Sequence, residues 1–331
     1  MVRSVALSSL SSMDPRQTSP RMRYDEIDPA CYDPKKRIEA MDIDGVGATL
    51  LFPSAGGAVS SIHDEELYLA CMSTYNDAVM EWAREASDRR VFPAAQIPCV
   101  GIEHAMAELE RVAKMGFRHY AFNQWPSGSP YPSPADDPFW SLLQETGLIV
   151  SFHGFGYGRP STSAAAGGVL THKNTKAVSV GGQPQEMIAA LRGAGLGATL
   201  GLGMLALSGV LERFPALRFG MIETSVGWFP TFMERLDDTF SRHRFLVEPG
   251  IGRLPSELLG RFRISMDREW MGLKWRHSVG VDNLMFGTDF PHIGNFYPHS
   301  RFYIELAMQD VPYEEKEKIL WSNGASLYGI D

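Results

Sequence analysis

Residues 285–292 read Met285-Phe286-Gly287-Thr288-Asp289-Phe290-Pro291-His292, an apolar run that leads into a carboxylate, a proline and an imidazole. The run has the composition of a buried β-strand. A carboxylate at the end of such a strand can bind a metal ion or accept a proton. Alternatively, Asp289 caps a helix that begins at Pro291, which is a common structural arrangement. This stretch supports both interpretations, and the rest of the chain decides between them.

Apolar runs with strand composition alternate with helical patterns along the chain. The expected strands are 48–53, 91–97, 119–123, 149–153, 217–223, 262–265 and 283–287. The expected helices are 64–87, 103–114, 137–145 and a glycine-rich segment at 193–210. Such alternation indicates parallel strands with helical crossovers, as in a (β/α)8 TIM-type barrel or a doubly wound sheet. No Gly-x-Gly-x-x-Gly opens a helix after an early strand, which argues against a Rossmann domain and a nucleotide cofactor.

The composition is that of an ordinary globular domain. The chain has 331 residues, of which 44% are hydrophobic and 21% are charged, and this length suits one barrel with insertions. We therefore expect a single domain over 1–331. The net charge of −8 argues against nucleic acid or an anionic membrane as a partner, and leaves a small-molecule substrate as the expected one.

Two further features concern location and assembly. Cys31, Cys71 and Cys99 are widely spaced and form no CxxC pair, which indicates a reducing compartment and a cytoplasmic location. The uncharged segment 193–210 is long enough to raise the question of a membrane span. Its glycine, alanine, serine and threonine content favours a buried or interface helix in which small residues permit close packing. We expect a homodimer or higher homo-oligomer.

Ionisable side chains follow four of the expected strands. His153 and Glu223 end two of them, Arg268 follows a third, and Asp289 and His292 follow the last. In a barrel the carboxyl ends of the strands converge on the axis, where catalytic groups lie. An imidazole and a carboxylate from separate strands are half of a mononuclear metal site. A lone strand-end histidine is usually structural, whereas four ionisable strand ends favour a functional site.

Short motifs in a fixed order carry a resemblance that extends over nearly the whole chain from about residue 24. They are the stretches 32–37, 41–53, 136–140, 151–154, 212–215, 223–230, 283–292 and 323–329. In this order they resemble the amidohydrolase-related family, which contains aminocarboxymuconate-semialdehyde decarboxylase, γ-resorcylate decarboxylase and metal-dependent hydrolases. The resemblance is specific for the fold and much less specific for the reaction. It implies a distorted (β/α)8 barrel around one divalent ion, zinc or manganese.

The resemblance also implies roles for individual residues. His153 and Asp289 match the family's metal ligands, and Asp289 also handles a proton. Glu223 matches an acid at the end of the sixth strand, and His292 and His299 lie in the loop after Asp289. We expect these two histidines to orient the substrate or to bind its carboxylate. The catalytic candidates are therefore His153, Glu223, Asp289 and His292.

Three other residues are candidates for substrate binding beside His299. Arg268 is placed to anchor a carboxylate. Trp125 belongs to an aromatic group that either lines a substrate pocket or packs the loops over the barrel mouth. Phe52, near the end of the first expected strand, is the third candidate.

The sequence departs from the family at two places. The family's first strand carries His-x-His or an acidic variant, whereas this chain has no histidine before His63. The corresponding positions fall near Ser9 and Ser11, and a neutral hydroxyl is a poor zinc ligand. Where decarboxylase members show His-x-Gly-Glu, this chain has Gly220-Met221-Ile222-Glu223, so an additional catalytic histidine is missing.

These departures leave three explanations open: a degenerate or truncated N-terminal segment at 1–30, a metal-independent enzyme, or a barrel kept as a scaffold. Because the ionisable strand ends remain, we expect an enzyme that hydrolyses a C–O or C–N bond in a small carboxylated or cyclic carbonyl substrate. The alternative is non-oxidative decarboxylation of an aromatic or muconate-type acid. A catalytically silent barrel that acts as a binding protein is the third interpretation.

Overall fold

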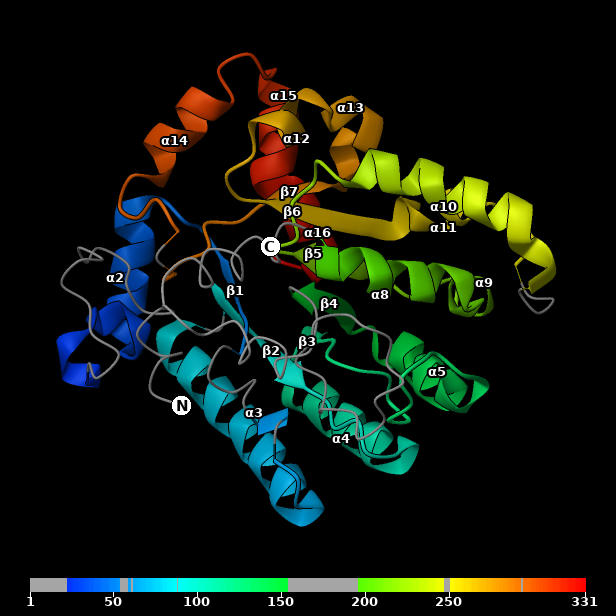
Figure 1. The fold of residues 1–331 in the computed structure, drawn as a ribbon. Helices are drawn as coiled ribbons and strands as arrows, with labels where there is room; N and C mark the ends of the chain where they lie inside the picture. Colours follow the sequence, from blue (N-terminus) through cyan, green and yellow to red (C-terminus); the bar gives the residue numbers. More distant parts are fainter. Residues whose placement is uncertain are drawn as a thin grey trace, which may run out of the picture.

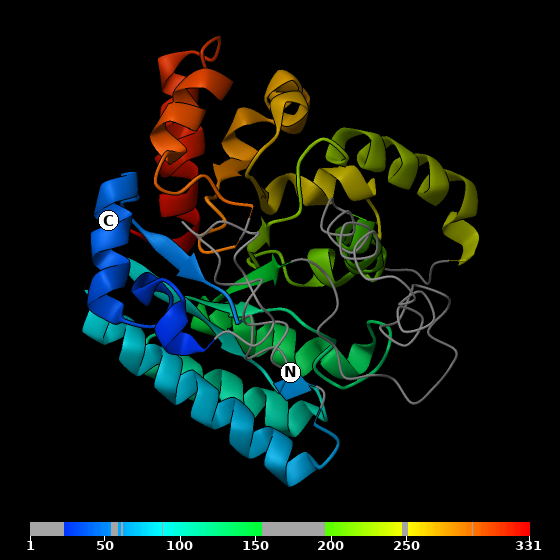
Figure 2. The ribbon, with the colours of Figure 1, turned by 60° about the vertical axis from the view of Figure 1, so that its left-hand side comes forward.

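The computed structural model describes residues 23–53, 59–60, 62–87, 89–153, 196–246, 251–292 and 294–331. Within these residues, seven strands form one parallel sheet in their order along the chain. The strands are β1 Thr49–Leu51, β2 Val91–Gln96, β3 His119–Ala121, β4 Ile149–His153, β5 Phe219–Ile222, β6 Phe262–Met266 and β7 Leu284–Phe286. The sheet curls around an axis, and helices cover its outer side (Figure 1 and Figure 2).

Helices connect the strands and follow the last one. The α-helices are α2 Pro34–Asp44, α3 Glu65–Ser87, α4 Ile102–Met115, α5 Asp137–Thr146, α8 Leu196–Leu207, α9 Val210–Arg213, α10 Phe229–His243, α11 Pro255–Leu258, α12 Trp270–Lys274, α13 Arg276–Val279, α14 Ser300–Ala307, α15 Tyr313–Glu317 and α16 Asn323–Tyr328. The 3-10 helices are η2 Tyr24–Glu26, η3 Pro29–Cys31, η5 Pro134–Asp136, η6 Arg244–Leu246, η7 Leu259–Arg261 and η8 Val281–Asn283, and η9 Lys318–Ser322 is a π-helix.

The predicted fold class, an α/β barrel of the TIM type, is confirmed in these residues. The helix predicted at 64–87 is α3, and the strand predicted at 149–153 is β4. The first strand is shorter than the predicted 48–53, and Pro53 has no N–H group with which to extend the ladder. The further strand expected near Ser9 and Ser11 lies outside the described residues.

Local signals determine where α2 begins and ends. The Asp33 carboxylate accepts hydrogen bonds from the backbone N–H groups of Lys35 and Lys36, and Pro34 occupies the first helical position. The helix ends at Gly45, whose φ of 77° is left-handed and suits glycine. This helix forms part of the wall of the cavity described below.

The main hydrophobic core lies between the sheet and its helices. Phe139, Trp140 and Leu143 of α5 are fully buried there, and each such side chain contributes about 1.5–3 kcal/mol relative to exposure. Phe152 of β4 belongs to the same core, whereas the ring of its neighbour His153 stacks on Phe52. Because successive side chains of a strand point to opposite faces, β4 presents Val150 and Phe152 to the helices and Ser151 and His153 to the barrel interior.

The glycine-rich segment predicted at 193–210 forms α8 from Leu196 onward. Leu202, Leu205 and Ala206 are fully buried, and Leu200 is exposed. None of the helices in the part of the chain that the structure describes has the length and apolar character needed to cross a membrane.

A buried polar network occupies the barrel interior around the start of β3. His119 Nδ1 lies 3.0 Å from Ser151 Oγ, and His119 Nε2 lies 3.2 Å from the Phe92 carbonyl oxygen. Ser151 Oγ is also 3.0 Å from the Tyr328 hydroxyl oxygen. The Tyr328 hydroxyl occupies the space where a side chain at Gly220 would stand, so glycine at that position lets α16 close the barrel.

Candidate active site

Two acidic residues follow their strands in an unusual backbone conformation. Glu223 follows β5 with a φ of 55°, and Asp289 lies after β7 with a φ of 59°. Residues other than glycine rarely adopt this left-handed conformation, which costs about 1–3 kcal/mol for each residue. Surrounding contacts must hold it in place. One of them is the hydrogen bond that the Glu223 N–H donates to Ser265 Oγ on β6, at 2.9 Å.

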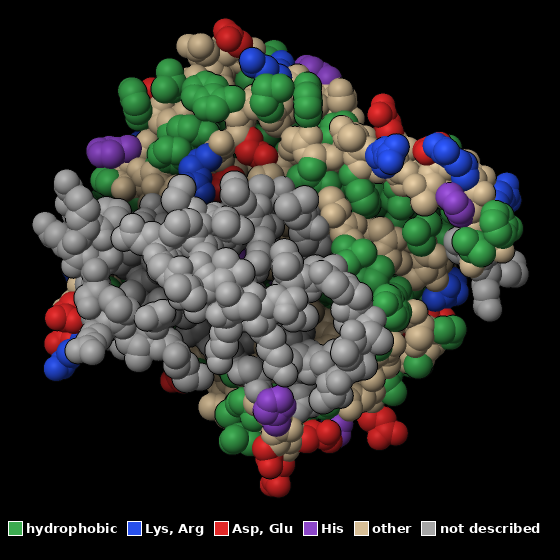
Figure 3. All heavy atoms as spheres, in the orientation of Figure 1, with side chains coloured by type: hydrophobic (Ala, Val, Ile, Leu, Met, Phe, Trp, Pro, Cys, Tyr) green, Lys and Arg blue, Asp and Glu red, His purple; other side chains and the backbone are tan. Residues whose placement is uncertain are grey.

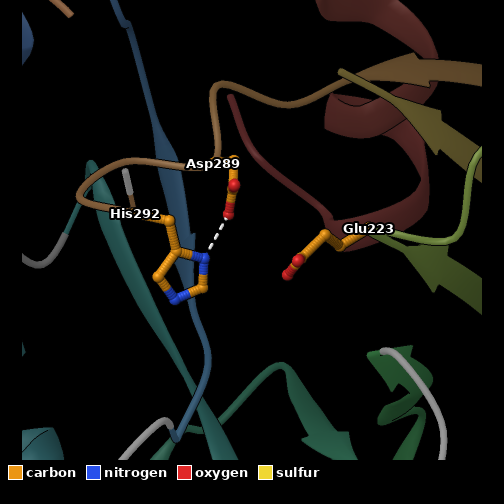
Figure 4. Close-up of side chains that lie close together, drawn as sticks. All are labelled: Glu223, Asp289 and His292. Carbon is orange, nitrogen blue, oxygen red and sulfur yellow. Dashed lines mark hydrogen bonds and ion pairs between the residues drawn. The ribbon is translucent and has the colours of Figure 1, made fainter. Parts of the chain in front are cut away.

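Four side chains form two hydrogen-bonded pairs at this end of the sheet. His292 Nδ1 lies 2.5 Å from Asp289 Oδ1, and His153 Nε2 lies 2.8 Å from Glu223 Oε2. One ligand atom each of Glu223, Asp289 and His292 lies within 4.8 Å of the other two. Figure 4 shows these three side chains pointing toward one another from the end of β5 and the loop after β7. Residues about 65 positions apart in the sequence therefore meet in one cluster.

The cluster lies in the wall of a cavity of about 690 Å³, a volume typical of small-molecule sites. The wall includes Phe52, His153, Glu223, Asp289 and His292. The Phe52 ring stacks on the His153 ring with centroids 4.4 Å apart. The cavity thus combines an aromatic surface with titratable groups, as small-molecule sites commonly do.

The surroundings move the pKa values of the two acids in opposite directions. Burial raises the pKa of Glu223, but the hydrogen bond and charge of His153 and the charge of His292 outweigh burial and hold it below its usual value. Burial and the charge of Glu223 raise the pKa of Asp289 above its usual value, although His292 opposes them. Burial lowers the pKa of His292, yet the bond to Asp289 and the charges of both acids raise it overall. Acids with pKa values moved apart are typical of acid–base sites.

The structure brings together five of the residues singled out in the sequence. His153, Glu223, Asp289, His292 and Phe52 all line the cavity. A sixth, Arg268, stands beside it, because its Nη2 lies 3.3 Å from the carboxylate of the cavity residue Asp267 and its charge lowers the pKa of Glu223.

Two expected substrate-binding residues lie elsewhere. Trp125 is 3% exposed and packs in the core against Phe122 and Trp140, with ring centroids 5.1 and 6.4 Å away. His299 is exposed and precedes α14 as its N-cap residue. Neither is part of the cavity wall. Of the two interpretations of the aromatic group, packing is therefore the correct one for Trp125.

Arg37 of α2 also belongs to the site, although its sequence context did not indicate this. Its side chain lines the cavity and is only 7% exposed. Its two sequence neighbours Lys35 and Lys36 are exposed, and a run of three basic residues near the start of a helix normally indicates a solvated surface. Only the position of α2 against the loop after β7 shows that the third of them is buried.

The donor types of the cluster suit a divalent ion. Two carboxylates and one imidazole are ligands that manganese and zinc accept. The expected metal pair was His153 with Asp289. In the structure Asp289 is grouped with Glu223 and His292, and His153 contacts Glu223 instead. Glu223 therefore offers a ligand atom to the cluster. The family resemblance had indicated only that it matches an acid at the end of a strand.

The order of motifs, the curled parallel sheet and the site at its carboxyl ends define one family. A family model described as Amidohydrolase matches residues 20–330. The chain belongs to the amidohydrolase family. A curated relative in the wider superfamily is 2-amino-3-carboxymuconate-6-semialdehyde decarboxylase from Dictyostelium discoideum. It is 22% identical over 314 residues, which cover 93% of this chain and 80% of that protein.

Solved structures of the amidohydrolase superfamily share the fold. The 5-carboxyvanillate decarboxylase from Sphingomonas paucimobilis matches with a TM-score of 0.70 and 21% identity, over 89% of this chain and 83% of that chain. The dihydroxybenzoic acid decarboxylase from Polaromonas sp. JS666, solved with manganese and the inhibitor 2-nitroresorcinol, matches with a TM-score of 0.67 and 20% identity, over 89% and 85% of the two chains.

These comparisons correct the expected reaction. We expected an amidohydrolase-family enzyme that hydrolyses a C–O or C–N bond, and the membership in this enzyme family is confirmed. The hydrolytic reaction is wrong, because the curated relative and the two solved structures described above are decarboxylases, which break a C–C bond. These relatives favour the alternative, non-oxidative decarboxylation. The missing histidine before Glu223 had counted against that reaction.

Proposed function

We propose that this amidohydrolase-family member is a metal-dependent, non-oxidative decarboxylase of an aromatic or muconate-type acid. The observation that carries the proposal is the meeting of Glu223, Asp289 and His292 within 4.8 Å in the wall of a cavity of about 690 Å³. The volume suits a substituted benzoic acid. The decarboxylases among the relatives support the same choice of reaction.

Glu223, Asp289 and His292 would hold the ion, manganese or zinc. When bound, the ion supplies Lewis-acid polarisation of a substrate oxygen. The hydrogen bond between the partly buried Asp289 carboxylate and His292 fixes the orientation of both groups before substrate enters. Since the ligands are already in place, binding the ion requires little rearrangement of the chain.

The reaction also needs a proton at the carbon that loses carbon dioxide. The balance is one carboxylate and one proton giving one C–H bond and carbon dioxide. His153 is the group we assign to deliver that proton, because its ring faces the cavity and is hydrogen-bonded to Glu223 at 2.8 Å. The stacked Phe52 ring holds the imidazole plane and covers one of its faces.

The test is direct. The purified chain, loaded with manganese or zinc, is incubated with 5-carboxyvanillate, 2,6-dihydroxybenzoate and a carboxymuconate semialdehyde, and carbon dioxide and the product are measured. We expect turnover of at least one acid, lost in Asp289→Asn and retained in His299→Asn, since His299 lies outside the cavity wall. Failure of every acid with a protein shown to bind one ion per chain would contradict the proposal.

We also propose a homodimer contact at α8. An apolar groove lies along α8 and α10, and its lining includes Leu200, Met204, Leu207, Trp228 and Phe232. Figure 3 shows hydrophobic side chains gathered over these helices. Exposed apolar patches of this kind commonly mark interaction sites. Light scattering should give the mass of two chains, and Leu200→Asp should give one; a monomeric mass for the parent would contradict this proposal.

A cytoplasmic location is the third proposal. Cys31, Cys71 and Cys99 take part in no disulfide bond within the described residues, which is usual for proteins of reducing compartments and unusual for secreted ones. Fractionation of cells that express the tagged chain should recover it with cytosolic markers. Recovery in a membrane or secreted fraction would contradict the proposal.

A further inference from the structure

Arg37 is a buried cation in the wall of the cavity. Its side chain is 7% exposed, and it lines the same cavity as Asp289 and His292. Its Nε and Nη1 atoms have no hydrogen-bond partner, and no ion pair joins it to an acid in the described part of the chain. Burial lowers its pKa to about 10, with Cys31 and Asp28 opposing the effect, so the group still carries its charge at neutral pH.

The cavity-lining acid of the same helix, Asp44, bonds to Ser300 and makes no ion pair with Arg37. Its Oδ1 accepts a hydrogen bond from the Ser300 N–H at 2.9 Å and its Oδ2 accepts one from the Ser300 hydroxyl at 2.7 Å. Both oxygens are therefore used to hold the start of α14. Arg37 thus faces the cavity with the charge of Asp28 nearby but with its Nε and Nη1 atoms unbonded, which is unfavourable unless an anion enters.

Packing alone does not account for Arg37. Its guanidinium carbon lies 4.5 Å from the centroid of the Phe290 ring, the residue after Asp289. A cation over an aromatic face is attracted to it, but this contact uses the flat face of the guanidinium. The N–H groups lie in the plane and remain available to an anionic oxygen.

The chemistry of decarboxylation decides which anionic group of the substrate Arg37 should bind. The reacting carboxylate is charged before the reaction and leaves as neutral carbon dioxide. An arginine bound to it would stabilise the substrate more than the transition state and would slow the reaction. A group that keeps its charge until product release does not create this conflict, so binding it anchors the substrate without a cost to the chemical step.

We propose that Arg37 binds a second carboxylate, one that stays on the product, and that the preferred substrates are therefore dicarboxylic acids. This inference rests on the proposed decarboxylase function and names its substrate class. Phe290 holds the guanidinium in place, and the loop that carries Phe290 also carries Asp289 and His292, so the anchored substrate is presented to the metal-binding cluster.

The test compares two unreactive ligands that differ by one carboxylate, benzoate and benzene-1,3-dicarboxylate. Calorimetric titration of the metal-loaded full-length chain should show the dicarboxylate binding about 10–100-fold more tightly, as a charge-assisted hydrogen-bonded pair allows. Arg37→Met should bring the dicarboxylate down to the affinity of benzoate and leave benzoate unchanged. Arg37→Lys, which keeps the charge with fewer donors, should fall between them.

Lys35→Met is the matched control, because it removes an exposed positive charge two residues away on the same helix. It should leave both affinities unchanged. Equal binding of the two ligands by the parent, or equal losses for both in Arg37→Met and Arg37→Lys, would overturn the inference. Circular dichroism shows whether each variant folds, and Arg37→Lys carries the test if Arg37→Met does not.

The same titration separates this inference from the proposed reaction. If the affinity gained from the second carboxylate requires Arg37 but no dicarboxylic acid is decarboxylated, the proposed anion subsite is correct and the proposed reaction is wrong. If decarboxylation occurs and Arg37→Met changes kcat and KM equally for mono- and dicarboxylic acids, the reaction stands and the subsite is wrong. The result expected is a rise in KM for dicarboxylic acids with a much smaller change in kcat.

Discussion

His119 of β3 and His153 of β4 lie on neighbouring strands and contact the same ring, that of Phe52, with centroids 5.4 and 4.4 Å away. His119, at the start of its strand, is fully buried among neutral partners. His153, at the end of its strand, is partly exposed in the cavity and bonded to the Glu223 carboxylate. The same residue type thus lies in a structural network at one end of the barrel and in the proposed active site at the other.

The partners of His119 determine its protonation. The Phe92 carbonyl oxygen can only accept, so His119 Nε2–H donates to it. Nδ1 then accepts from the Ser151 hydroxyl, whose oxygen accepts from the Tyr328 hydroxyl. Every member is neutral and satisfied, and burial lowers the pKa of His119 to about 4. A complete neutral network of this kind holds a core in one arrangement.

The cluster at the other end has the opposite properties. Glu223 and Asp289 are charged groups in a strained backbone conformation, and both line a cavity open to a ligand. Strain and charge of this kind destabilise the free protein and persist where they serve a function. Substitutions at the two ends should therefore have opposite consequences, and the following predictions test that difference.

The largest effect is expected for Asp289→Asn. This variant should lose metal and decarboxylation, with kcat reduced by about 10²–10⁴-fold. Its free energy of unfolding should be equal to or higher than the parent's in metal-free protein, because it removes a buried charge whose pKa is raised by burial and by Glu223. Urea unfolding and single-turnover kinetics measure the two quantities. A clear loss of stability in the metal-free variant would place Asp289 with the structural residues.

The stability of the parent should depend on pH through His119. An unfolded histidine binds a proton below its ordinary pKa of 6.5, whereas His119 does so only below about 4. Between these values the unfolded state binds more protons, so the free energy of unfolding falls as pH falls, by up to about 3 kcal/mol. Urea unfolding from pH 7 to pH 4 measures it. In His119→Gln the free energy of unfolding should depend less steeply on pH. Parallel curves for the variant and the parent would contradict the low pKa of His119.

Metal affinity should separate the two histidines of the site. His292→Asn removes a proposed ligand and should weaken manganese binding by about 10–100-fold, whereas His153→Asn should keep the affinity and lose the proton donor. Calorimetric titration with manganese chloride measures the first effect, and turnover measures the second. If His153→Asn loses the metal and His292→Asn keeps it, the ligand pair expected from the family resemblance is the correct one.

The smallest effect is expected for Ser151→Ala, at the structural end. The variant leaves His119 Nδ1 and the Tyr328 hydroxyl without their shared partner, so the free energy of unfolding should fall by about 1–3 kcal/mol. Metal affinity and kcat should stay at parent values, since Ser151 does not line the cavity. Thermal melts and turnover rates together check this, and a change in kcat would show that the two ends are coupled.

The comparison also shows which parts of the site were predictable. His153, Glu223, Asp289 and His292 were predictable because each follows a strand of clear composition, and the ends of parallel strands meet at one edge. Trp125 was assigned to the pocket because an aromatic residue after a strand has the same sequence signature whether it faces a cavity or a core. Its burial against Phe122 and Trp140 depends on how α5 packs, which no local pattern encodes.

The amino-acid sequence by itself determined the succession of strands and helices, because hydrophobic periodicity, caps such as Asp33 and glycines such as Gly45 act over a few residues. It also determined the family, since the motifs lie in one order along the chain. Only the tertiary structure decided that Glu223 joins Asp289 and His292, that His119 is buried among neutral partners while His153 contacts a carboxylate, and that Arg37 is buried. Pairing partners, desolvation and pKa values depend on distances between residues far apart in the chain, and the curl of the sheet sets those distances.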